Sequence, residues 1–313
     1  MKKTAIVFAI ILVFYLGLSI LGAILTMDIP RLPVNVSPSS VGLNYEDVSF
    51  PSRGDGVVLK GWYLPAQGNA IIILVHGGFQ NRIDDHADTL ELAHDLVQRG
   101  YNILLFDQRG RGESAGAARS LSHFQQDIGG AVDFARGKGF FREEIGVIGF
   151  CSGAISTCIY ASEEHDIGAV VLDGCSTTVR NMVYAQAAER SIPKPLLSIF
   201  MPGLTTAVRV FYNYKEVDPI HVIPQVKCPV FFIHEEKDDL VTMAEMTQLF
   251  GGARNPNNEI LEISRALHSQ GYIVDPAGYV NRLDSYFQRT LKANVEIATR
   301  SNYTMNLSLT ISH

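Results

Sequence analysis

Short apolar runs rich in β-branched residues recur along this chain of 313 residues, and segments of helical periodicity lie between most of them. Runs that are apolar throughout predict strands buried on both faces, which is typical of a parallel sheet. Strands that alternate with helices predict an α/β fold, a mostly parallel sheet with helices on both faces. The expected strands are 70–75, 101–106, 145–150, 167–172, 230–234 and 260–263, and the expected helices are 87–98, 124–135, 153–162, 243–250 and 277–291.

A second group of segments precedes this alternation. Residues 46–50 and 57–64 flank the turn Ser52-Arg-Gly-Asp-Gly and predict a β-hairpin. Residues 31–40 are rich in Pro and Ser and are interpreted as a linker. We therefore expect the globular domain to occupy residues 41–295.

One interval breaks the rhythm of strands and helices. Almost sixty residues separate Leu172 from Val230, which is more than one crossover helix needs. The middle of this interval is apolar and aromatic, so we expect a small helical cap over the sheet at about residues 177–222. Two ordinary surface helices are the alternative. Residues 296–313 form a C-terminal tail without clear periodicity, and the sequence predicts no structure for them.

No charged residue occurs between Thr4 and Met27, a run of 24 residues. A helix of this length measures about 36 Å, enough to cross a hydrocarbon core of about 30 Å. The run is longer than the apolar core of a signal peptide, and no small-residue cleavage site follows it. We expect residues 1–30 to be a single-pass signal-anchor that contacts the lipid bilayer through residues 4–27; a cleaved signal peptide is the alternative.

The charges beside this run predict its orientation. Lys2 and Lys3 precede it, whereas only Arg31 follows closely. The positive-inside rule then places the N-terminus in the cytoplasm and the globular domain outside it. Because the hairpin and the sheet begin after residue 40, we expect the domain to fold without the helix.

Composition excludes some other functions. The chain has 26 basic and 32 acidic residues and a net charge of −6, and no stretch is basic enough to follow a nucleic-acid backbone. We therefore expect no nucleic-acid partner. The four cysteines, at positions 151, 158, 175 and 228, are too few and too scattered for a disulfide framework or a zinc site.

The sequence Gly149-Phe-Cys-Ser-Gly153 follows one expected strand and opens the next helix. A nucleophile on such a strand-to-helix turn needs very small residues two positions before and after it, because the backbone closes tightly there. Gly149 and Gly153 satisfy this spacing for Cys151. A nucleophile at Ser152 would instead place Phe150 at a position with no room for it. A glycine-bounded strand end with an unreactive buried thiol is the structural alternative.

A second glycine-rich turn, His76-Gly-Gly78, follows the strand at 70–75. At this place a turn presents a backbone N–H group to an oxyanion. We assign this oxyanion hole to the N–H groups of Gly78 and Ser152, with Phe79 as the alternative to Gly78. His76 is interpreted as a structural histidine that hydrogen-bonds its loop.

The segment Phe106-Asp-Gln-Arg-Gly-Arg-Gly-Glu-Ser114 follows the strand at 101–106. We interpret Asp107 and Arg109 as members of a hydrogen-bonded turn that supports the scaffold.

The last two reactive side chains are expected late in the chain. Asp238 lies in an acidic turn after the strand at 230–234, with Asp239 and Asp173 as alternatives. His268 is the only histidine between Asp238 and the final residue. In a nucleophile–acid–base order, His268 would take the proton of the Cys151 thiol, and Asp238 would fix the orientation of the imidazole.

These elements together resemble the α/β-hydrolase superfamily, over about residues 42–291. Gly42-Leu-Asn-Tyr-Glu-Asp-Val-Ser-Phe50 and Leu59-Lys-Gly-Trp-Tyr-Leu-Pro65 resemble the branch with serine aminopeptidase-like and acyl-peptidase-like hydrolases. The strand-to-helix turn that carries Cys151 is the nucleophile elbow of this superfamily. With a cysteine as its nucleophile, it resembles the elbow of dienelactone hydrolases and of acyl-CoA:amino-acid acyltransferases. The resemblance implies no metal or organic cofactor.

The sequence therefore predicts a membrane-anchored hydrolase that cleaves a small-molecule acyl substrate through a covalent acyl-enzyme. An ester, a thioester or a lactone fits this chemistry. An acyltransferase with the same triad is one alternative, and a catalytically inactive binding protein on the hydrolase scaffold is the other.

Overall fold

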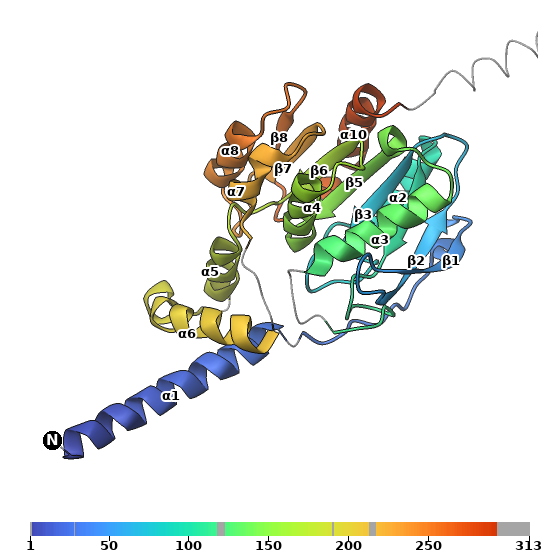
Figure 1. Ribbon diagram of the computed structural model, residues 1–313. Coiled ribbons are helices and arrows are strands. Elements are labelled where there is room, and N and C mark those ends of the chain that lie inside the picture. Colours follow the sequence, from blue (N-terminus) through green and yellow to red (C-terminus); the bar gives the residue numbers. More distant parts are fainter. Residues whose placement is uncertain (1, 28, 118–122, 190, 213–216, 293–313) are drawn as a thin grey trace, which may run out of the picture.

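The computed structural model describes residues 2–27, 29–117, 123–189, 191–212 and 217–292. Its centre is an eight-stranded sheet with the order β1-β2-β4-β3-β5-β6-β7-β8 (Figure 1). The β1–β2 and β2–β4 pairs are antiparallel and the other pairs are parallel, which confirms the mostly parallel sheet. The strands are β1 (Glu46–Pro51), β2 (Val58–Leu64), β3 (Ile71–Val75), β4 (Asn102–Phe106), β5 (Ile145–Phe150), β6 (Ala169–Asp173), β7 (Val230–Glu235) and β8 (Glu259–Ile263).

Helices cover both faces of the sheet, as expected (Figure 1). Successive residues of a strand face opposite sides: Ile71 and Ile73 of β3 pack with α3 and α4, whereas Ile72 and Leu74 pack with α2 and α10. The main helices are α2 (Thr89–Gln98), α3 (Phe124–Gly137), α4 (Ser152–Glu163), α8 (Met243–Gly252) and α10 (Pro276–Thr290). The short ones are α7 (Pro219–Val222), α9 (Gly271–Val274) and three 3₁₀ turns, η1 (Pro38–Val41), η3 (Arg142–Glu144) and η4 (Ile223–Gln225). The ends of the expected sheet elements and of the helices that cover them differ from these by no more than two residues.

The long interval between β6 and β7 is helical, but its arrangement differs from the expected cap. It contains α5 (Val179–Glu189) and α6 (Lys194–Tyr212). The α5 helix leads away from the carboxyl edge of the sheet, and α6 lies beside α1 (Lys2–Met27) instead of across the sheet (Figure 1). The reason is that α6 carries an apolar stripe, and α1 supplies a matching apolar surface for it.

The N-terminal helix α1 packs against α6 along part of its length. Much of α1 is exposed, whereas Ser19, Ala23 and Met27 are buried. Ala23 and Met27 belong to a core cluster shared with α6. Within the described residues, α1 and α6 are the two helices long and apolar enough to cross a membrane.

The linker that follows α1 is also attached to the domain. The guanidinium of Arg31 donates to the backbone carbonyls of Ser114 and Gly116, in the loop after β4. The side-chain amide of Asn81, in the loop after β3, donates to the carbonyls of Leu32 and Pro33. These contacts fix the end of α1 to loops at the carboxyl edge of the sheet. The expected tail, residues 296–313, lies outside the described residues.

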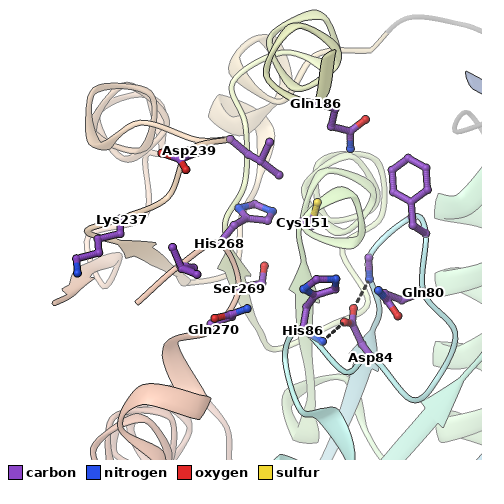
Figure 2. A pocket seen from close by; sticks show the side chains of 15 residues that line it. Gln80, Asp84, His86, Cys151, Gln186, Lys237, Asp239, His268, Ser269 and Gln270 are labelled. Carbon is purple, nitrogen blue, oxygen red and sulfur yellow. Dashed lines mark hydrogen bonds between the residues drawn. The ribbon is translucent and has the colours of Figure 1, made fainter. Parts of the chain in front are cut away.

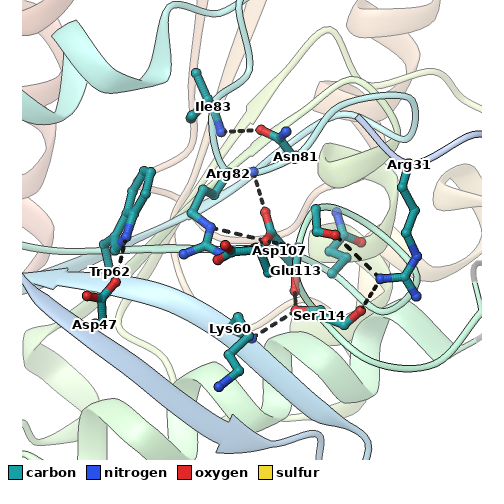
Figure 3. Close-up of polar contacts among 12 residues, drawn as sticks. Arg31, Asp47, Lys60, Trp62, Asn81, Arg82, Ile83, Asp107, Glu113 and Ser114 are labelled. Carbon is teal, nitrogen blue, oxygen red and sulfur yellow. Dashed lines mark hydrogen bonds and ion pairs between the residues drawn. The ribbon is translucent and has the colours of Figure 1, made fainter. Parts of the chain in front are cut away.

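The motif after β4 supports the fold through a buried ion pair (Figure 3). Both carboxylate oxygens of Asp107 accept hydrogen bonds from Arg82, and the Arg82 guanidinium lies 4.6 Å from the centre of the Trp62 ring. Gly112 has a φ of 42°, and a Cβ there would collide with the Asp107 carboxylate. Asp107 thus pairs with Arg82, whereas the expected partner in its own turn, Arg109, pairs with Asp127 instead.

Candidate active site

Cys151 occupies the turn between β5 and α4 in a backbone conformation that few residues adopt. Its φ is 53° and its ψ is −118°. Only tight surroundings sustain a positive φ at a residue that is not glycine, and such positions concentrate at functional sites. A Cβ on Gly149 would lie 2.6 Å from the carbonyl oxygen of Gly153, and a Cβ on Gly153 would collide with the carbonyl oxygens of Val75 and His76. Both glycines are required for the turn to close.

Cys151 is also the accessible thiol. It is partly exposed, whereas Cys158, Cys175 and Cys228 are buried. Burial raises the pKa of Cys158 to about 12 and that of Cys228 to about 12, and it raises the pKa of Cys175 well above its usual value. A thiol must form its thiolate to act as a nucleophile, so these three are unsuited to the role.

The loop after β8 places His268 beside Cys151 (Figure 2). Its Nδ1 atom donates to the Oδ2 atom of Asp238 over 2.7 Å. Its Nε2 atom is buried with no hydrogen-bond partner of standard geometry among the described residues. Burial of the ring lowers the pKa of His268, but the neighbouring Cys151 and Asp238 raise it more, to well above its usual value. The His268 imidazole can therefore take up and keep a proton beside the Cys151 thiol.

Asp238 is fixed by its own turn. Its Oδ1 atom accepts from the N–H groups of Leu240 at 2.7 Å and Val241 at 2.8 Å, and its side chain is fully buried. The alternative Asp239 is exposed and lines the cavity instead. The other alternative, Asp173, accepts from the hydroxyl of Tyr279 at 2.7 Å. Of the three candidates, Asp238 is the one that contacts the imidazole through a hydrogen bond.

The expected oxyanion donors lie in the turn after β3 and at the first residue of α4. Gly78 lies against Ser152, because a Cβ on Gly78 would be 2.6 Å from the Ser152 hydroxyl oxygen. The N–H of Gly77 donates to the Asp84 carboxylate at 2.9 Å, which holds the turn. In the described part of the chain, the N–H groups of Gly78 and Ser152 have no such acceptor. They could therefore donate to a bound oxyanion.

His76 has a structural environment. It is fully buried, its Nδ1 atom donates to the carbonyl of Gly77, and its Nε2 atom accepts from the N–H of Gln108. Burial lowers the pKa of His76. Both ring nitrogens are occupied, so this histidine has no free nitrogen for a substrate.

Cys151 and His268 line a cavity of about 410 Å³ (Figure 2). Several side chains at its wall were not singled out by any sequence pattern, namely His86 and Gln80 from the loop after β3, Gln270 from the loop after β8, and Gln186 from α5. Polar loop residues have no periodicity, so only the folded chain could bring them together. Among the described residues, no group of three or more His, Cys, Asp or Glu side chains is placed to hold a metal ion.

A buried pair of carboxyl groups lies behind the imidazole, and sequence reasoning missed it as a pair. Asp173 and Glu235 end neighbouring strands β6 and β7, and both are buried. Burial raises the pKa of Asp173 to about 6, and burial together with Asp173 raises that of Glu235 well above its usual value. Two carboxyl groups in this position share a proton more readily than they both ionise. A glutamate at the end of an otherwise apolar strand, Phe231-Phe-Ile-His-Glu235, was the available signal.

Comparison with known proteins identifies similar sequences and structures. A family model described as serine aminopeptidase, S33, matches residues 66–219. The uncharacterised protein YqkD of Bacillus subtilis is 28% identical over 207 residues, which cover 64% of this chain and 66% of that protein. The α/β-hydrolase domain-containing protein WAV2 of Arabidopsis thaliana is 25% identical over 250 residues, covering 76% of this chain and 77% of that protein. A crystal structure of the esterase Pf2001 of Pyrococcus furiosus is similar with a TM-score of 0.72 and 25% identity, over 85% of this chain and 98% of the esterase.

Proposed function

This protein belongs to the α/β-hydrolase superfamily and is a hydrolase, and we propose that it cleaves an acyl substrate through Cys151, His268 and Asp238. The substrate bond is that of an ester, a thioester or a lactone. The observation that carries the proposal is one arrangement: a partly exposed thiol in an elbow turn, beside an imidazole that donates to Asp238 over 2.7 Å.

The reaction proceeds through a covalent thioester. His268 takes the proton of the Cys151 thiol, and the sulfur attacks the substrate carbonyl carbon. The N–H groups of Gly78 and Ser152 donate to the oxygen that becomes negative. The protonated His268 then gives its proton to the leaving alcohol or thiol.

Water completes the cycle. His268 takes a proton from the attacking water while the water oxygen adds to the acyl-enzyme carbonyl, and the Cys151 thiolate then leaves and takes that proton from His268. Asp238 stabilises the charged imidazole in both halves. The products are a carboxylic acid and an alcohol or thiol.

The test separates the two adjacent candidates for the nucleophile. We expect Cys151→Ala to abolish both turnover and the mass increase of an acyl-enzyme formed with an activated short-chain ester. Ser152→Ala should keep a substantial fraction of both, because only its backbone N–H is used. Turnover that survives Cys151→Ala but is lost in Ser152→Ala would refute the assignment.

We also propose that α1 anchors the enzyme in a membrane, with the N-terminus in the cytoplasm and the domain on the other side. Support comes from the uncharged run 4–27, most of whose large apolar side chains are exposed, and from Lys2 and Lys3 ahead of it. Protease added to intact cells should digest the domain. Digestion only after lysis would reverse the orientation, and a mature chain that starts near residue 28 would identify a cleaved signal peptide.

Acyl transfer is the second candidate function, and the cysteine nucleophile is the reason to retain it. A thioester intermediate reacts with amines as well as with water, so an amine in the cavity could accept the acyl group. Formation of an amide at the expense of the free acid, when an amine is added to the acyl-enzyme, would identify transfer.

A further inference from the structure

The contact between α6 and α1 has the character of a helix pair inside a membrane. Small residues meet where the helices approach most closely: a Cβ on Gly203 would collide with the Ser19 hydroxyl, and Leu204 lies at Gly22. Ser19 and Ala23 are four apart on α1, as are Gly203 and Ala207 on α6. Small residues at this spacing allow the close backbone approach that stabilises helix pairs in lipid.

A tyrosine hydroxyl adds polar contacts to this interface. The Tyr15 hydroxyl donates to the carbonyl of Ile199 at 3.2 Å and accepts from the N–H of Gly203 at 3.0 Å. The Tyr15 ring stacks on Phe200 with ring centres 5.5 Å apart. Pro202 lies inside α6 and lacks an N–H group. The Tyr15 hydroxyl therefore hydrogen-bonds backbone groups of α6 close to the position of Pro202, where the N–H group is missing.

Large apolar side chains near the two ends of α6 are exposed. Four of them are between about half and three-quarters exposed: Leu196 49%, Ile199 62%, Val210 70% and Phe211 62%. No charged residue occurs from Pro195 to Val208, a run of 14 residues. The 19-residue helix reaches a spanning length only if Arg209 is included, whereas the uncharged run has the length of a re-entrant or interfacial segment. These exposed side chains add to the exposed apolar side chains of the neighbouring α1.

The active site and the segments that lead to α1 and α6 share the carboxyl edge of the sheet. The segment with α5 and α6 leaves the sheet after Asp173, at this edge, and the linker after α1 is bonded to loops of the same edge. Gln186 of α5, the helix that connects this edge to α6, lines the cavity of Cys151 (Figure 2). A bilayer that holds α1 would therefore lie on the side of the domain where Cys151 is found.

We infer that α6 is embedded in the near side of the bilayer beside α1, and that the substrate is an amphiphilic acyl ester dissolved in that bilayer. The inference rests on the proposed membrane anchor and acyl hydrolysis. The ester enters along α5 with its carbonyl reaching Cys151, while the rest of its chain stays in lipid. The reaction is the one proposed above; only the source of the substrate is new.

The first test locates α6 by fluorescence quenching. The chain has a single tryptophan, Trp62, which is buried in the domain, so a second tryptophan can be read against a small background. The full chain is reconstituted in vesicles whose lipids carry bromine on the acyl chains. We expect strong quenching for Ile199→Trp on α6 and for Val13→Trp on α1. Phe141→Trp, on an exposed site of the domain, should show little.

The three variants distinguish the two ways to fail. Quenching of Val13→Trp without quenching of Ile199→Trp would overturn the embedding of α6 and leave the anchor intact. Absence of quenching at both positions would overturn the anchor as well.

The second test compares two substrates for each variant, a long-chain ester in vesicles and a short water-soluble ester. Phe211→Lys puts a charge into the embedded surface, so we expect its vesicle-to-soluble rate ratio to fall at least about tenfold. Phe141→Lys adds the same charge to an equally exposed phenylalanine of the domain and should leave the ratio unchanged. An unchanged ratio in Phe211→Lys would overturn the bilayer as the source of substrate, whereas loss of hydrolysis by Cys151→Ala tests the chemistry separately.

Discussion

Two regions of this protein bring distant segments together, and they do so by different means. At the carboxyl edge of the sheet, Cys151, Asp238 and His268 are held by backbone turns and hydrogen bonds that leave almost no freedom. At the α1–α6 pair, small residues and one tyrosine hydroxyl make the contact, and large apolar side chains of both helices stay exposed. The first region is held by contacts within the described domain, whereas the second leaves apolar side chains uncovered. The difference gives the proposed membrane contact its test, because only the second region should respond to apolar surroundings.

The largest effect should come from the imidazole and its carboxylate. His268→Ala removes the base and Asp238→Asn removes the charge that orients it, so each should lower the acylation rate by about 10³- to 10⁴-fold. Single-turnover acylation with an activated short ester measures this in both variants. Asp239→Asn is the matched control and should change the rate only slightly. A larger loss in Asp239→Asn than in Asp238→Asn would reassign the acid.

The rigidity of the elbow predicts the next effect. Gly153→Ala places a methyl group on the carbonyls of Val75 and His76, between which the backbone cannot shift without opening the sheet. We expect a loss of stability of about 4 kcal/mol or more, or no folded protein. Gly137→Ala, where a Cβ meets nothing within 4 Å, is the control and should fold normally. Thermal unfolding in detergent micelles compares the two, and equal midpoints would contradict the tight closure.

Deletion of residues 1–30 tests the second region. Sequence patterns predict that the domain folds without the helix; in the structure, the deletion also uncovers Met201, Leu204, Ala207 and Val208 of α6. Burial of such side chains contributes about 1.5–3 kcal/mol for each large one, so the truncated chain should associate in water. We expect normal hydrolysis of a soluble ester in detergent and large oligomers on size exclusion without it.

A second substitution makes this expectation sharper. Met201→Lys with Leu204→Lys in the truncated chain should restore a monomer without detergent, because the uncovered stripe is then polar. A truncated chain that is monomeric without these changes would show that α6 finds another partner in the domain.

The smallest effect concerns pH and the buried carboxyl pair. A carboxyl group whose pKa is raised by folding holds its proton more tightly in the native state. The stability it contributes is therefore present below its unfolded pKa and lost as the pH rises through the folded value. With the pKa of Asp173 raised to about 6 and that of Glu235 raised well above its usual value, stability should decline from about pH 4 upward.

Glu235→Gln removes one of the two titrating groups and keeps a donor for Asp173. Relative to the parent, the variant should gain about 1–2 kcal/mol at pH 8 compared with pH 5. Thermal unfolding midpoints at the two pH values measure this gain. Glu143→Gln, at an exposed carboxylate, is the control and should show no such difference. A variant that loses stability equally at both pH values would mean that Glu235 acts through packing alone.

Most of the sheet, and the loops of the sheet that carry the candidate residues, followed from the sequence, because short-range patterns govern them. Apolar runs and helical periodicity predicted each strand and covering helix to within two residues. The pair Gly149 and Gly153 selected Cys151, since a side chain at either position would meet backbone atoms. Chain order alone left Asp173, Asp238 and Asp239 as candidates.

Tertiary structure decided what depends on contacts between segments far apart in the chain. The sequence named Asp238 as the partner of His268 but left Asp173 and Asp239 open, and it did not indicate that Arg82 and not Arg109 pairs with Asp107 or that α6 lies on α1. Each of these is a choice among chemically equivalent partners, and the choice is made by which surfaces the sheet brings within reach. Local patterns determine how a segment folds, whereas the partner of a side chain is determined by the packing of the whole chain.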